Sequence, residues 1–267
     1  AQFGGDFCRS GEKLMNGFKT LLKKEWQEQV RTFRLLIVGG VFLFFGLLTP
    51  VMIKYLPEII KLAGEDIGII ELPPPAALQA LAEYSATALQ MGLLVAILVT
   101  MGAIAGERSR GTAVMTLSKP VSTVAFVTAK LLAISFTFII GLAVGGIGAY
   151  GYTWMLIEEG NLTGFIGQTA LLSVYLIFCI TTTLVFSAVF RNALAAGGVS
   201  IAVLLASGGL GAIPWVGRVM PSSITSWGNH LVAGEGGGAE WLALGITLVL
   251  IGAGVYLATN ILKGKEI

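Results

Sequence analysis

Six long apolar stretches, separated by polar segments, dominate the pattern of residues along this chain of 267 residues. A hydrocarbon core about 30 Å thick is crossed by about 20 apolar residues in a helix that rises about 1.5 Å per residue. The pattern therefore predicts an all-α integral membrane protein with a single six-helix transmembrane domain over residues 35–262. The predicted spans cover about 35–53, 84–105, 131–154, 165–190, 193–216 and 241–262, and residues 263–267 form a tail.

Residues 15–34, before the first predicted span, are amphipathic with the period of a helix. The apolar side carries Phe18, Leu21, Leu22, Trp26, Val30 and Phe33, and the polar side carries Lys23, Lys24, Gln27, Arg31 and Arg34. Such a segment typically lies in the membrane interface with its tryptophan at head-group level. The alternative is a basic flank that only sets the topology. Residues 1–14 are expected to be a disordered extension, because Met15 opens a more typical start.

The connections between the spans differ in length. The fourth and fifth spans are separated only by Arg191 and Asn192, which predicts a tight helical hairpin. Residues 54–83 contain three consecutive prolines, 73–75, which predict a semi-rigid break in the helix. Residues 217–240 are compatible with a flexible loop or with short helices in the membrane interface.

The basic residues are distributed unequally between alternate connections. Fourteen lysines and arginines fall before the first span, in the second and fourth loops, and after the sixth span, whereas three fall on the other side. Cytoplasmic segments carry an excess of basic residues. We therefore expect a multi-pass protein of the cytoplasmic (inner) membrane with both termini in the cytoplasm.

Composition narrows the function further. The chain is 55% hydrophobic and 12% charged, against about 25% charged residues in soluble proteins, and a net charge of +2 gives no indication of nucleic-acid binding. The predicted spans are essentially uncharged, so they offer almost nothing that a proton- or ion-coupled carrier would titrate. The sequence also has no phosphate-binding loop, G-x-S-x-G or H-E-x-x-H motif, and its two cysteines do not have metal-ligand spacing. We predict no catalytic residue, metal site or cofactor in this chain, and energy supplied by a separate protein.

The loop between the second and third predicted spans contains the most informative pattern. Residues 106–110 are charged and turn-prone, and residues 112–118 can form about two helical turns. Pro120 ends that helix, because the residue before a proline is disfavoured in the helical region, and Ser122 can cap the next span. The pattern predicts a short helix parallel to the membrane that can transmit force. A basic loop that only sets the topology is the alternative.

This loop resembles that of ABC-2 type permeases, the membrane subunits of bacterial and archaeal ABC exporters. The matching residues are Glu107, Arg108, Gly111, Thr112, Leu117, Ser118, Pro120 and Lys130. Thr123 departs from the pattern, because many members have a basic residue there. The stretch "LLKKEWQEQVR" resembles the elbow helix of the family, and its expected interfacial residues are Leu22, Lys23, Lys24, Trp26 and Arg31.

The resemblance implies a permease that forms the translocation path and is coupled to a separate ATPase. The short helix at residues 112–118 would then be a coupling helix seated on one of two ATPase subunits, which bind ATP and magnesium. The expected ATPase-coupling residues are Glu107, Arg108, Gly111, Thr112, Leu117, Ser118 and Pro120. A second permease, identical or paralogous, would complete the transporter in the lipid bilayer. A non-transporting anchoring or assembly subunit is the main alternative, and a secondary carrier or an intramembrane enzyme is less favoured. The transported substrate is not predicted. Gly141 and Gly145 form a G-x-x-x-G pattern suited to a helix–helix seam, but the sequence does not indicate which helix packs against it.

Overall fold

The computed structural model describes residues 3–63, 74–111, 122–211, 213–235 and 240–264. These residues form ten helices and no strand. The helices are α1 (Phe3–Arg31), α2 (Arg34–Ala63), α3 (Ala77–Thr100), α4 (Ala105–Ser109), α6 (Thr123–Leu156), α7 (Leu162–Val189), α8 (Ala193–Gly211), α9 (Pro214–Gly217), α10 (Ser223–Ala233) and α11 (Trp241–Gly264).

Six helical segments are long and apolar enough to cross a membrane, which confirms the predicted fold class. They are α2, α3 together with α4, α6, α7, α8 and α11. Several of these helices are longer than the predicted spans, and α6 begins at Thr123 rather than near residue 131. Hydropathy identifies the part of a helix that lies in hydrocarbon, whereas backbone hydrogen bonding continues into the polar ends.

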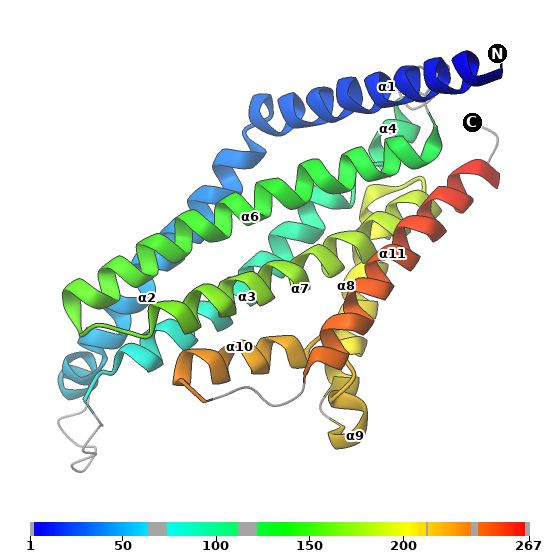
Figure 1. Cartoon of the computed structure of the whole chain (residues 1–267). Coiled ribbons are helices and arrows are strands. Elements are labelled where there is room, and N and C mark those ends of the chain that lie inside the picture. Colours follow the sequence, from blue (N-terminus) through cyan, green and yellow to red (C-terminus); the bar gives the residue numbers. More distant parts are fainter. Residues whose placement is uncertain (1–2, 64–73, 112–121, 212, 236–239, 265–267) are drawn as a thin grey trace.

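The N-terminal helix is also longer than the sequence indicated. The sequence predicts a disordered extension over residues 1–14, whereas α1 begins at Phe3. Residues 3–14 contain no proline, so the hydrogen-bonding pattern of the amphipathic stretch can continue through them. α1 lies across the end of the bundle at which both termini are found (Figure 1).

The glycine pattern of α6 forms a seam within the chain. α6 runs beside α2 along much of the bundle (Figure 1). A Cβ added at Gly141 would lie 2.9 Å from Val38 Cγ1, and one at Gly145 would lie 2.5 Å from the Phe42 carbonyl oxygen. Gly46 of α2 faces the Gly145 carbonyl in turn. The G-x-x-x-G pattern therefore lets the backbones of α2 and α6 approach closely.

Residues 217–240 contain the helix α10, as in the second of the two alternatives for this segment. α10 packs against α7, with Ile224 and Trp227 buried beside Leu171. The Leu231 carbonyl accepts a hydrogen bond from Asn161 Nδ2 at 3.1 Å. Gly234, with φ 75°, ends the helix.

Candidate functional site

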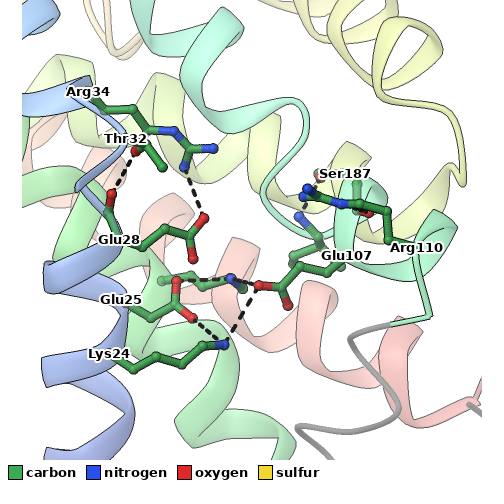
Figure 2. A network of polar contacts seen from close by, with 11 residues as sticks. Lys24, Glu25, Glu28, Thr32, Arg34, Glu107, Arg110 and Ser187 are labelled. Atoms are coloured by element: carbon green, nitrogen blue, oxygen red, sulfur yellow. Dashed lines mark hydrogen bonds and ion pairs between the residues drawn. The ribbon is translucent and has the colours of Figure 1, made fainter. Parts of the chain in front are cut away.

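Three helices, α1, α4 and α6, meet at the end of the bundle where the termini lie (Figure 1). Their charged side chains form a cluster (Figure 2). Glu25 comes from α1, Glu107 from α4 and Lys130 from the first two turns of α6. Lys130 Nζ donates hydrogen bonds to Glu25 Oε2 at 2.9 Å and to Glu107 Oε1 at 2.7 Å. We call Glu25, Glu107 and Lys130 the triad.

Burial makes the three members of the triad depend on one another. The side chains of Lys130, Glu25 and Glu107 are 3%, 4% and 10% exposed. A buried charge without a partner costs several kcal/mol, of order 3–5 when one member of a pair is removed. Lys24 adds longer contacts, 3.6 Å to Glu25 and 3.9 Å to Glu107, from a side chain that is 48% exposed. The two cations balance the two carboxylates.

The acidic residues of this region also lie close enough together to raise the question of a metal. Carboxylate oxygens of Glu25, Glu28 and Glu107 lie within 4.8 Å of one another. The Lys130 ammonium, however, is already hydrogen-bonded to two of the three carboxylates, and Glu28 pairs with Arg34 at 3.7 Å. The geometry is therefore that of an ion-pair network that joins helices.

The turn between α1 and α2 lies next to the triad. Phe33 has a left-handed backbone with φ 57°, which is uncommon for a residue with a side chain. The Glu28–Arg34 pair spans this turn, and Thr32 Oγ1 donates to the Glu28 carbonyl at 2.6 Å. These contacts set the angle between α1 and α2, and with it the position of Glu25 next to α6.

α4 is fixed to α7 by Ser187, near the end of α7. Ser187 Oγ accepts hydrogen bonds from the backbone N–H groups of Ile104 at 3.1 Å and Ala105 at 3.0 Å, and it donates to the Met101 carbonyl at 2.8 Å. Ile104, at the N-cap of α4, has no polar side chain that could cap the helix. Ser187, 83 residues further along the chain, supplies the cap instead. Arg108 Nη1 also donates to the Ala188 carbonyl at 2.9 Å.

Replacing Ser187 by alanine is expected to lower the free energy of unfolding by about 2 kcal/mol, because two buried N–H groups lose their acceptor. Ser173→Ala is the control, since among the described contacts this serine of α7 donates only to the carbonyl of Thr169, four residues back. Thermal unfolding of both purified variants in one detergent measures the difference. Equal midpoints for the two variants would contradict this function of Ser187.

The structure describes only part of the predicted coupling segment. Glu107 is in the triad, Arg108 contacts α7, and Gly111 has φ 71° just after α4. Four predicted residues lie outside the described residues: Thr112, Leu117, Ser118 and Pro120. The predicted cap of the next span is confirmed, since Ser122 Oγ accepts from the Ala125 N–H at 3.1 Å.

The predicted interfacial residues of α1 fall into two groups. Leu22 and Trp26 are half-buried and line a groove against α6, whereas Lys23, Lys24 and Arg31 are exposed. Sequence reasoning missed Glu25, which is the α1 member of the triad. One signal was available: Glu25 falls among apolar positions of the helix, between Leu21 and Phe18 around its axis, where a solvated carboxylate is not expected.

Two comparisons with known proteins gave a match to this chain. Residues 19–219 match the family model described as "ABC-2 family transporter protein". The chain is also 27% identical over 240 residues to the "Uncharacterized transmembrane protein YxlG" of Bacillus subtilis (strain 168). That alignment covers 89% of this chain and 93% of the Bacillus protein.

Proposed function

Because this chain belongs to the ABC-2 transporter family, we propose that it is the permease subunit of an ABC exporter. In this proposal it forms the translocation path in the cytoplasmic membrane together with a second permease, identical or paralogous. Two copies of a separate ATPase subunit bind ATP and magnesium and supply the energy. Residues 112–120 contact the ATPase and Glu107 connects this loop to the triad, with both termini on the same, cytoplasmic, side.

The triad is the observation that carries the coupling proposal. α4 leads directly into residues 112–121, and α4 is bound on three sides: to α1 and α6 through the triad and to α7 through Ser187. Because buried, hydrogen-bonded contacts resist separation, a displacement of α4 would move all three helices. A force that reaches α4 is therefore passed on to α1, α6 and α7.

Two further observations support the orientation and the partner. α1 and the end of α11 lie at the same end of the bundle as α4 (Figure 1), which agrees with the excess of basic residues in these segments. The sequence contains no phosphate-binding loop, which supports the proposal that a separate subunit hydrolyses ATP.

The proposal is tested by purifying the chain from its own membranes, identifying any ABC ATPase that co-purifies with it, and measuring ATP hydrolysis by the complex. Glu107→Lys is expected to weaken the association about tenfold, within the range of coupling energies known for linked sites, because it places a third cation beside Lys24 and Lys130. Pro120→Ala, which leaves the triad intact, is expected to preserve the complex but reduce stimulation of the ATPase by the permease.

Glu235→Lys is the matched control, because it makes the same charge reversal at an exposed residue outside the triad. Glu235 follows the last residue of α10 and, among the described contacts, pairs only with His230. Wild-type association and stimulation in both coupling variants would contradict the proposal. A wild-type chain that binds no ATPase would favour the anchoring or assembly alternative. ATP-independent transport that collapses with the ion gradient would favour a carrier.

A further inference from the structure

A groove separates part of α1 from α6, next to the triad but distinct from it. It has a volume of about 360 Å³ and is lined only by apolar side chains: Leu22, Trp26, Leu132, Ala133, Phe136 and Ile140. The rings of Trp26 and Phe136 meet edge to face, with centroids 6.5 Å apart. The groove therefore has an aromatic wall where α1 crosses α6.

The α6 side of this groove faces away from the helix bundle. Leu132, Phe136 and Ile140 recur every four residues, so they lie on one face of α6, and all three are exposed in the chain. Ala133, which is 1% exposed, lies beneath them. In a protein that crosses the membrane at α6, such an exposed apolar face contacts the hydrocarbon of the bilayer. The groove is thus open to lipid.

The α1 side of the groove carries positive charge at its edge. Around the axis of α1, the buried residues Leu21 and Glu25 are followed by half-buried Leu22 and Trp26. Lys19 and Lys23 come next and are exposed. Helical spacing places both lysines beside the groove, on its side away from the bundle.

We propose that this groove binds a phospholipid with an anionic head group from the leaflet in which α1 lies. One acyl chain occupies the apolar groove, and the phosphate contacts Lys19 and Lys23. An apolar helix of a second copy would fill the groove but would offer no negatively charged group to Lys19 and Lys23. A phospholipid has both parts at the required junction of hydrocarbon and water, with Trp26 in the interfacial position that tryptophan favours. The site needs no ATPase, so it can fail or succeed independently of the proposed function.

Quenching of Trp26 fluorescence by brominated lipid tests the site in the full-length protein. The protein is reconstituted in phosphatidylcholine vesicles that contain the same minor fraction of brominated phosphatidylglycerol or brominated phosphatidylcholine. Subtracting the signal of Trp26→Phe isolates Trp26 from the other four tryptophans. We expect brominated phosphatidylglycerol to quench Trp26 at a severalfold lower fraction, because each lysine near the head groups strengthens anionic binding by about fivefold.

The double variant Lys19→Gln, Lys23→Gln is expected to abolish this preference while leaving quenching by brominated phosphatidylcholine unchanged. Lys263→Gln is the matched control, since Lys263 is an exposed lysine in the last turn of α11. Equal quenching by the two lipids in the unaltered protein would overturn the proposal, and so would a preference that survives in the double variant. Absence of quenching by either lipid would show that protein covers the groove, which also overturns it.

Discussion

Replacing Lys130 by methionine is expected to lower the free energy of unfolding by about 3–5 kcal/mol, the cost of leaving a buried charge without its partner. Methionine nearly fills the volume of lysine but removes the buried cation that hydrogen-bonds both Glu25 and Glu107, and leaves them only the longer contacts of the exposed Lys24. For a chain of this length the loss corresponds to a fall of about 10 °C in the unfolding midpoint. Thermal unfolding of the purified protein in detergent, followed by fluorescence, measures it.

Lys24→Met is the matched control for this prediction. Lys24 contacts the same two carboxylates, but at 3.6 and 3.9 Å and from an exposed side chain. Exposed ion pairs contribute about 0–1 kcal/mol, so this variant should unfold within a few degrees of the wild type. The triple variant Lys130→Met, Glu25→Gln, Glu107→Gln should recover most of the lost stability, because it removes the unpaired charges as well. If the Lys130→Met and Lys24→Met variants have the same unfolding midpoint, the triad does not stabilise the protein.

Gly145→Leu is expected to be comparably damaging, for a steric reason. A Cβ at this position would lie 2.5 Å from the Phe42 carbonyl oxygen and 2.6 Å from Tyr84 Oη. The first neighbour is backbone, so it cannot move aside without separating α2 from α6. Overpacking a core costs about 1–3 kcal/mol and occasionally more, and we expect about 3 kcal/mol or more here. The unfolding midpoint and the yield of monodisperse protein should both fall.

Gly151→Leu provides the control on the same helix, because nothing lies within 4 Å of a Cβ built at Gly151. A glycine inside a helix costs about 1 kcal/mol relative to alanine, so this change should be neutral or slightly stabilising. A Gly145→Leu protein as stable as Gly151→Leu would show that α2 and α6 do not pack closely at this seam.

The number of spans was predictable from the sequence, whereas their ends were not. An apolar run long enough to cross a bilayer has few alternatives to a spanning helix, since lipid offers no partner to the backbone. The polar ends carry no such restriction. α3 therefore begins at Ala77, just after Pro74 and Pro75, and α6 begins at Thr123, where Ser122 caps it. The helix in residues 217–240 was one of two open alternatives, because its amphipathic pattern is short.

The candidate site was predictable in part. Family resemblance singled out Glu107 and Lys130, and the structure brings them within 2.7 Å of each other. Glu25 could not be paired with them from the sequence, because it lies 105 residues before Lys130 and no local spacing joins them. Ser187 was hidden for the same reason, since it caps a helix from a distant part of the chain.

The sequence by itself determined the class of protein, the six spans and the excess of basic residues in alternate connections, because hydrophobicity and charge act on each segment separately. Only the tertiary structure decided which segments meet. It placed Gly141 and Gly145 against α2, and it buried Lys130 between two carboxylates from different helices. Close backbone approach and burial of a charge are properties of pairs of helices, so they are settled only when the bundle assembles.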